Sequence, residues 1–304
     1  TLKILMDSGL TPLLQKAGAS YGFGPQHVAA LIHPGLSVQD DFFTQRVGGI
    51  NVDFRPILQQ VISSELDADR MDYLRRDSLG AGVSYGEFDF SWLVGNLTAH
   101  VQNGKCYLCL CQRGLYAFED FLISRFHMFL MVYFHYKTVI FDEMLAQHLM
   151  NPDCGYHLPA DIEEYCQHND SRLYSYLATC EEYWARRIIE KRPYRILIEL
   201  HSGIPTKLSA QEKQHRVLEE LRVMLKERRV QYLTVSSTSE LSKYFGKPAD
   251  PIFVKYDNHY HPTQYLPLTE CTDLFERYRE KRSITRLYIP AEQADQVAAP
   301  HSLF

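Results

Sequence analysis

The sequence lacks the features that mark membrane proteins and nucleic-acid-binding proteins. It has no uninterrupted apolar run of roughly 18 or more residues, the length that a membrane-spanning helix needs. Its most apolar stretch, from Phe118 to Phe141, is broken by charged and histidine side chains. A basic excess is also missing, because 32 Lys and Arg residues stand against 37 Asp and Glu residues, a formal net charge of −5. We therefore expect no membrane partner, and we do not expect nucleic acid as the main partner.

A disulfide framework is missing as well. The seven cysteines are an odd number at irregular spacing, which is not the pattern of a small secreted scaffold. Cys106, Cys109 and Cys111 could suggest zinc, but they alternate as strand residues do, and no second Cys or His pair follows at finger spacing. Tetrahedral zinc needs four ligands, so ordinary strand cysteines are favoured. The cysteine usage predicts a reducing, cytoplasmic location.

The sequence contains enough apolar material for a proper core, since 45% of its 304 residues are hydrophobic. Up to residue 191 the pattern predicts one hairpin over 97–112, turning at Asn103-Gly104, and helices at about 11–17, 25–32, 64–78, 116–150, 161–166 and 171–191. Beyond it, strands near 194–200, 230–235, 252–256 and 284–289 alternate with helices near 209–229, 239–245 and 269–281. We predict a mainly α fold, with a multihelical domain over residues 1–191 and a small α/β (α+β) domain over residues 192–304.

The segment from Ile62 to Ser78 holds the densest group of chemically active side chains, with five acids and three arginines. At 100° per residue, Asp69, Tyr73 and Arg76 fall on one helical stripe and Asp77 lies beside it. A carboxylate, a phenol and a guanidinium on one stripe could bind a metal ion, a sugar and a phosphate. The alternative is a solvated face with ion pairs between residues one turn apart, and the spacing alone favours this alternative.

A longer motif favours the first interpretation. The segment ISSELDADRMDYLRRDSLGAGVSYGEFDF, which starts at Ile62 and includes Gly86-Glu87-Phe88-Asp89 near its end, closely resembles the signature of HD-domain deoxynucleoside triphosphate triphosphohydrolases. This family includes bacterial dGTPase-like proteins and the animal dNTPase that carries a sterile-alpha-motif domain. The resemblance implies a multihelical, HD-domain-like lobe. The small C-terminal domain is similar to the appendage of the bacterial branch.

The resemblance implies roles for four residues of this segment. Asp69 matches the aspartate that completes the family's metal site, a hard oxygen ligand beside imidazoles. Arg70 matches a basic residue near the triphosphate, where a guanidinium binds phosphate bidentately. Tyr73 matches a tyrosine that packs against the deoxyribose, and Asp77 matches the aspartate that accepts a hydrogen bond from the sugar 3′-hydroxyl.

Two further residues lie in the predicted long helix. Arg125 is costly in so apolar a helix unless it has an anionic partner. The family has an arginine near the phosphates and, eight residues later, a tyrosine near the base and sugar, and Arg125 and Tyr133 fit that spacing. The alternative is a purely structural pairing of Arg125 with Glu119, with Asp120, or with a carboxylate between Asp67 and Asp77.

The sequence departs from the family pattern in one respect. The family holds its divalent metal cofactor with a histidine, a His-Asp pair and the later aspartate, but no histidine directly precedes an aspartate here. The chain also opens Thr1-Leu2-Lys3 without an initiator methionine. We expect that the lobe carrying the other ligands is missing, that this chain is inactive by itself, and that no catalytic residue can be named in it.

The function implied by the resemblance is metal-dependent hydrolysis of a deoxynucleoside triphosphate to a deoxynucleoside and triphosphate. Two alternatives remain. One is a non-catalytic nucleotide-binding regulatory or scaffold protein, and the other is an HD phosphohydrolase acting on another phosphoester. The resemblance also implies a homo-oligomer. Tyr73 and Asp77 favour a deoxynucleotide because, in the roles the resemblance implies, they contact the sugar rather than the phosphates.

Overall fold

The computed structural model describes residues 1–39, 41–202, 208–241, 250–258, 260–278 and 281–297. Contacts between residues divide the chain into two compact units, and neither unit is one continuous stretch. The first unit comprises Thr1–Met128, Ala160–Glu164 and Leu241–Arg279, and the second comprises Phe129–Pro159, Tyr165–Glu240 and Glu280–Phe304. The predicted boundary between residues 191 and 192 stays a prediction.

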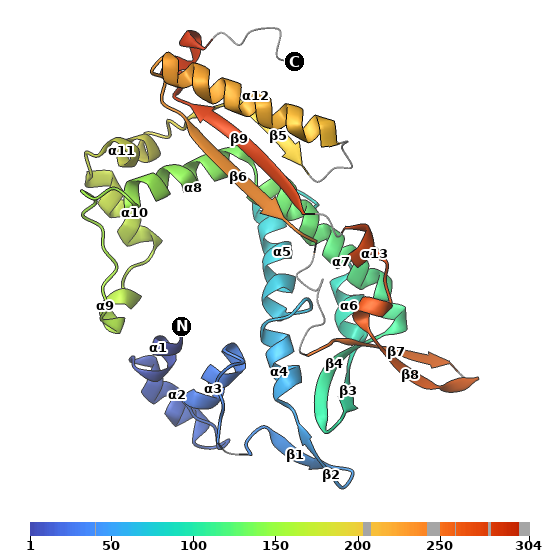
Figure 1. Ribbon diagram of the computed structural model, residues 1–304. Helices are drawn as coiled ribbons and strands as arrows, with labels where there is room; N and C mark the ends of the chain where they lie inside the picture. The colour runs from blue at the N-terminus through green and yellow to red at the C-terminus, as the bar shows by residue number, and fades with distance from the viewer. Residues whose placement is uncertain (40, 203–207, 242–249, 259, 279–280, 298–304) are drawn as a thin grey trace. The chain divides into compact units, whose positions relative to one another are not determined.

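The first unit contains a mixed six-stranded sheet with helices around it (Figure 1). Its strands are β1 (Thr44–Val47), β2 (Ile50–Asp53), β3 (Leu97–Gln102), β4 (Lys105–Cys111), β7 (Phe253–Asn258) and β8 (His261–Pro267). Strand β4 is central, because it pairs antiparallel with β3 and parallel with both β2 and β7. The helices are α1 (Leu2–Met6), α2 (Leu10–Gly18), α3 (Pro25–Ile32), α4 (Arg55–Ile62), α5 (Ala68–Ala81), α6 (Phe90–Gly95), α7 (Leu115–Met128) and α13 (Leu274–Arg277).

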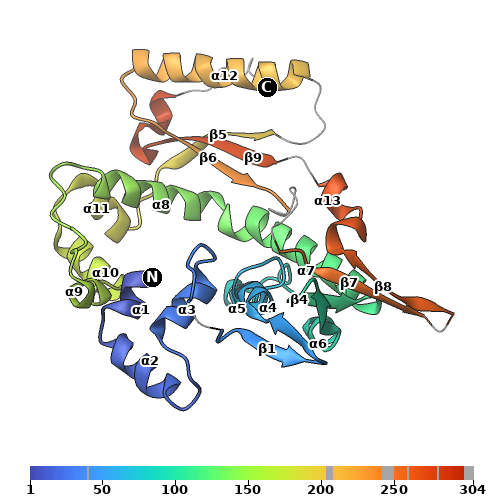
Figure 2. The same cartoon turned by 60° about the horizontal axis from the view of Figure 1, so that its bottom comes forward.

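The second unit has a three-stranded antiparallel sheet in the order β5 (Arg195–Ser202), β9 (Arg282–Ile289) and β6 (Leu233–Ser239). Helix α12 (Leu208–Glu227) lies along one face of this sheet and α8 (Tyr136–Leu149) lies on the other (Figure 2). Leu221 and Leu225 of α12 pack with Leu287, whereas Ile140 and Met144 of α8 pack with the neighbouring strand residue Tyr288. The remaining helices are α9 (Ile162–Cys166), whose first residues belong to the first unit, α10 (Asp170–Thr179) and α11 (Tyr183–Ile189).

The prediction of a mainly α fold, with an HD-domain-like helical lobe and a small α/β appendage, is wrong. The structure is 49% helix and 21% strand, and its described residues form two sheets, so its class is α/β. Strands β1, β2 and β8 were not expected, and β7 was assigned to the C-terminal domain. In the structure, β7 pairs with β4 through Cys109, Leu110 and Cys111. Pairing between strands so distant in sequence leaves no local signal, which is why the error arose.

Several elements follow the sequence closely. The hairpin over 97–112 is confirmed, with six residue pairs from Leu97–Leu110 to Gln102–Lys105. The helix at 25–32 has the predicted bounds, and the helix at 11–17 is found as α2. The strands near 194–200, 252–256 and 284–289 correspond to β5, β7 and β9.

Other elements differ. The single helix predicted over 116–150 is three segments, because α7 passes into a π-helical turn at Phe129–Tyr133 and the chain then breaks before α8. The helix predicted over 171–191 is divided into α10 and α11 where Glu182 caps a new N-terminus. The helix predicted over 269–281 is limited to α13. The one predicted over 239–245 lies mostly outside the described residues.

Candidate functional site

Helix α5 carries four of the predicted site residues, and it starts later than the sequence suggested. Ser63 ends α4, with an extended backbone. Asp67 is the cap, because its carboxylate accepts a hydrogen bond of 2.8 Å from the Arg70 backbone N–H. Burial raises the pKa of Asp67, although the Arg70 hydrogen bond and charge act in the opposite direction. The helix ends at Gly82, whose left-handed backbone (φ 68°) favours glycine.

Asp69, Tyr73 and Asp77 occupy one face of α5. They follow each other at intervals of four residues, which in an α-helix places side chains one above the other. Asp69 is exposed, and Tyr73 and Asp77 are partly buried. Asp69 also lies in the first turn, where the positive end of the helix dipole favours a carboxylate. This face presents two carboxylates with a phenol between them.

A buried carboxylate joins the two predicted phosphate-binding arginines. Glu65 is 1% exposed, and its Oε2 atom lies 3.0 Å from Arg70 Nη1 and 3.5 Å from Arg125 Nη1. Arg70 comes from α5 and Arg125 from α7, so residues far apart in sequence meet at one oxygen atom. Arg125 Nη1 also donates to the Leu241 carbonyl at 3.0 Å, and Arg70 Nε lies 3.2 Å from Asp67 Oδ2. The cluster has two positive and two negative side chains when all are ionised.

Glu65 is the residue that sequence reasoning missed. The structural alternative for Arg125 named Glu119, Asp120 and the acids from Asp67 to Asp77, whereas the observed partner lies just before this range. Glu119 instead accepts a hydrogen bond from Thr272. The available signal was an acid directly before the apolar residue Leu66, and the structure buries both residues.

Tyr133 lies in the second unit, in the π-helical turn, where its ring packs against Phe129 with centroids 5.0 Å apart. The first unit therefore brings together Asp69, Arg70, Tyr73, Asp77 and Arg125. The assignment of Tyr133 to the base and sugar stays a prediction.

The described residues do not supply a complete donor set for a metal ion. Within them, no three His, Cys, Asp or Glu side chains are arranged so that they could hold a metal ion. Asp69 alone supplies one carboxylate, which does not fit a complete divalent-metal site. In the same ranges, no helix has the length and apolar character to cross a membrane.

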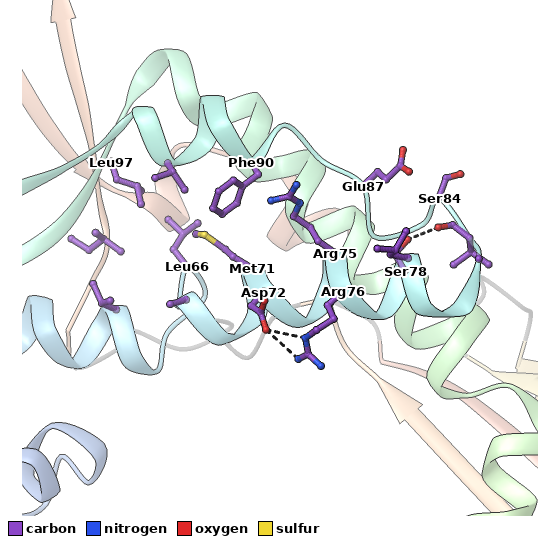
Figure 3. Close-up of a pocket in the computed structure, with 17 residues that line it drawn as sticks. Leu66, Met71, Asp72, Arg75, Arg76, Ser78, Ser84, Glu87, Phe90 and Leu97 are labelled. Carbon is purple, nitrogen blue, oxygen red and sulfur yellow. Dashed lines mark hydrogen bonds and ion pairs between the residues drawn. The ribbon is translucent and has the colours of Figure 1, made fainter. Parts of the chain in front are cut away.

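A cavity of about 960 Å³ lies against another face of α5 (Figure 3). Met71 of α5 and Phe90 of α6 point into it, together with Leu66 and Leu97. Asp69, Tyr73 and Asp77 are not among its lining residues. The Arg75 guanidinium lies over the Phe90 ring, 4.8 Å from the centroid. The cavity is thus mainly apolar and separate from the face that carries the predicted site.

Comparison with known proteins gives relatives without assigned function. No family model matches the chain. It is 33% identical over 139 residues to the uncharacterized protein MJ1154 of Methanocaldococcus jannaschii, covering 46% of this chain and 30% of that protein. It is 28% identical over 217 residues to the uncharacterized protein YwfO of Bacillus subtilis, covering 62% and 47% respectively. The chain therefore spans less than half the length of these relatives.

One solved structure resembles the fold over most of the chain. It is a crystal structure of a phosphohydrolase from Bacteroides thetaiotaomicron, with a TM-score of 0.54 and 18% identical residues. The match covers 92% of this chain and 70% of that protein. The chain thus has a fold found in a phosphohydrolase, and at this identity the likeness concerns the fold alone.

Proposed function

We propose that this chain is part of a metal-dependent phosphohydrolase that converts deoxynucleoside triphosphates into deoxynucleosides and triphosphate. The observation that carries the proposal is the convergence of Arg70 and Arg125 on Glu65 beside the first turn of α5. The Asp69, Tyr73 and Asp77 face begins in that same turn. The likeness to a phosphohydrolase fold supports the same class of reaction.

In this proposal the triphosphate binds near Arg70 and Arg125. Their contacts with Glu65 hold both side chains in place before a ligand arrives, which lowers the entropy lost on binding. Arg70 is 18% exposed and Arg125 is 9% exposed. Arg70 is therefore the better placed to form new bidentate hydrogen bonds to phosphate oxygens, while Arg125 adds positive charge from a more buried position.

In this proposal the sugar is recognised by the face of α5 that carries Asp69, Tyr73 and Asp77. Asp77 accepts a hydrogen bond from the 3′-hydroxyl, and the Tyr73 ring packs where a 2′-hydroxyl would otherwise lie. Asp69 serves as one ligand of a divalent cation, and the remaining ligands come from outside this chain. Water activation and leaving-group protonation are not assigned to any residue of this chain.

The test uses the full-length protein that contains this chain, incubated with each deoxynucleoside triphosphate and a divalent cation. Release of a deoxynucleoside and intact triphosphate, separated by ion-exchange chromatography, is the expected result. Asp77→Asn is expected to raise KM for deoxynucleotides by about tenfold, because the hydrogen bond from the 3′-hydroxyl loses its charged acceptor.

Asp72→Asn is the matched control, since Asp72 is an exposed acid of the same helix paired with Arg76. It is expected to leave KM unchanged. An unchanged KM in Asp77→Asn with every deoxynucleotide would contradict the sugar contact. Orthophosphate or diphosphate as the only inorganic product would contradict the proposed reaction.

A further inference from the structure

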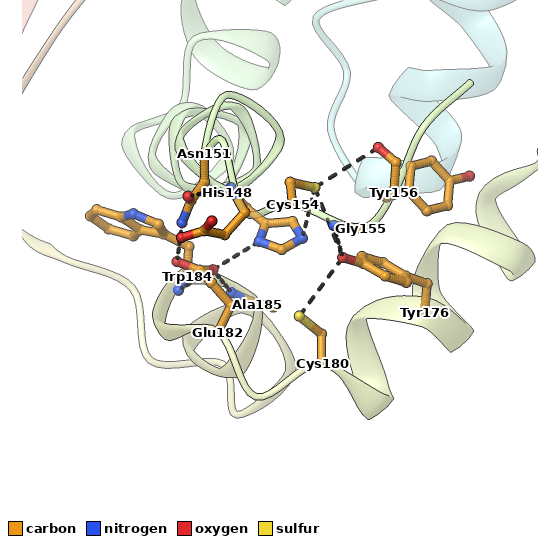
Figure 4. A network of polar contacts seen from close by, with 11 residues as sticks. His148, Asn151, Cys154, Gly155, Tyr156, Tyr176, Cys180, Glu182, Trp184 and Ala185 are labelled. Carbon is orange, nitrogen blue, oxygen red and sulfur yellow. Dashed lines mark hydrogen bonds and ion pairs between the residues drawn. The ribbon is translucent and has the colours of Figure 1, made fainter. Parts of the chain in front are cut away.

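A group of nucleophilic and titratable side chains lies in the second unit (Figure 4). It consists of His148 in the last turn of α8, Cys154 in the following loop, Tyr176 of α10, Cys180 at the end of α10 and Glu182 at the start of α11. They come from three helices and the loop after α8. Their convergence is therefore a product of tertiary packing.

Three of these side chains are arranged as nucleophile, base and orienting acid. The Cys154 Sγ atom lies 3.7 Å from His148 Nε2, and His148 Nδ1 lies 2.8 Å from Glu182 Oε2. His148 is fully buried and Cys154 is 5% exposed. A thiol, an imidazole and a carboxylate in this order form the arrangement by which a cysteine is activated as a nucleophile.

The surroundings of Glu182 determine which nitrogen of His148 carries the proton. Glu182 also accepts hydrogen bonds from the backbone N–H groups of Trp184 and Ala185. Burial raises the pKa of Glu182, but the hydrogen bonds from His148, Ala185 and Trp184 outweigh it, and the pKa lies below its ordinary value. An ionised carboxylate can only accept, so His148 Nδ1 donates. Nε2 is then left to accept the Cys154 proton.

Tyr176 links the first thiol to a second one. Its Oη atom lies 3.9 Å from the sulfur of Cys154 and 3.9 Å from that of Cys180, and it accepts from the Gly155 backbone N–H at 3.1 Å. Burial and the two thiol contacts raise the pKa of Tyr176 to about 12, so the phenol keeps its proton. The sulfurs of Cys154 and Cys180 are therefore neighbours of the same phenol oxygen.

We propose that Cys154 and Cys180 form a peroxide-oxidisable dithiol, in which Cys154 is the attacking thiol and Cys180 the resolving one. His148 takes the Cys154 proton, and the thiolate attacks one oxygen of hydrogen peroxide. The O–O bond breaks, the leaving hydroxide takes the proton from His148, and Cys154 becomes a sulfenic acid with release of water. The Cys180 sulfur then attacks the Cys154 sulfur, the S–O bond breaks, and the leaving hydroxide takes the proton that Cys180 gives up. A disulfide and a second water result, so two thiols are oxidised and one peroxide is reduced.

The alternative is that the cluster only ties α8, α10 and α11 together. Reactivity would then follow exposure, and Cys166 would react first because it is an exposed cysteine in this structure. A thiol hydrogen bond from Cys154 to the Tyr156 carbonyl at 3.9 Å would fit such a role. The two interpretations therefore differ in which cysteine is oxidised first.

The experiment treats the folded chain with one equivalent of hydrogen peroxide, blocks the remaining thiols with an alkylating reagent and maps the peptides by mass spectrometry. The expected product is a Cys154–Cys180 disulfide. In Cys180→Ser, a sulfenic acid on Cys154 is expected to be captured by dimedone. Cys166→Ser is the control and is expected to oxidise like the wild type.

Glu182→Gln tests the positioning of His148, because the amide oxygen still accepts the backbone hydrogen bonds while the charge is lost. We expect it to slow Cys154 oxidation about tenfold at an unchanged melting temperature. Oxidation of Cys166 ahead of Cys154 would overturn the proposal. So would an equal rate of Cys154 oxidation in Glu182→Gln and wild type.

Discussion

The buried carboxylate of Glu65 stabilises the charges of two arginines. Its carboxylate is almost fully removed from water and has two guanidinium groups beside it. Removing one partner from a buried ion pair leaves an uncompensated charge in a medium of low polarity, which costs more than the pair contributes. Arg125 is itself buried, with 7% of the whole residue exposed, so its charge also depends on an anionic neighbour.

We expect Glu65→Gln to lower the free energy of unfolding by about 3 kcal/mol, because Arg125 loses its charged partner. Asp72→Asn is the control, and it should change stability by less than about 0.5 kcal/mol, since its partner Arg76 and Asp72 itself are both mainly exposed. Urea unfolding followed by circular dichroism measures both. Equal effects of the two substitutions would show that Glu65 does not hold the arginines in this way.

At the scale of elements, α5 depends on the loop that follows it. Gly86 packs against the last turns of the helix, and its N–H donates to Ser78 Oγ at 3.2 Å. A Cβ atom at position 86 would lie 2.8 Å from Ser78 Cβ and would collide with the Leu74 carbonyl. Backbone approach this close is available only to glycine. The loop therefore returns along α5 and helps to line the cavity beside it.

Gly86→Ala is expected to destabilise the protein by about 1–3 kcal/mol, because the loop must move away from α5. Gly80→Ala provides the comparison within the same helix, since a Cβ there meets nothing within 4 Å. It should stabilise the protein by about 0.5–1 kcal/mol through the higher helix propensity of alanine. Thermal unfolding of both variants measures these opposite changes in stability. An unchanged melting temperature in Gly86→Ala would contradict the close packing.

At the scale of the whole chain, one segment near the C-terminus, Leu241–Arg279, belongs to the first unit. Strand β7 pairs with β4 through residues that are completely or almost completely buried, including Cys109, Leu110 and Val254. Leu241, in the same segment, accepts the hydrogen bond from Arg125. The first unit is therefore assembled from both ends of the sequence.

A chain ending at residue 191 should not fold, because it exposes the β4 edge and removes a partner of Arg125. We expect it to aggregate on size-exclusion chromatography and to show no cooperative unfolding transition, unlike the full chain measured in parallel. A monodisperse fragment with a cooperative transition would instead support the predicted boundary at residue 192.

The sequence by itself determined the local features of this protein. The spacing of Asp69, Tyr73 and Asp77, the turn at Asn103-Gly104 and the bounds of α3 depend on neighbouring residues, whose conformational preferences act over a few positions. Only the tertiary structure decided the α/β class, the partner of Arg125 and the meeting of Cys154 with His148 and Glu182. These depend on contacts between distant segments, where packing and the need to satisfy buried polar groups select the partners.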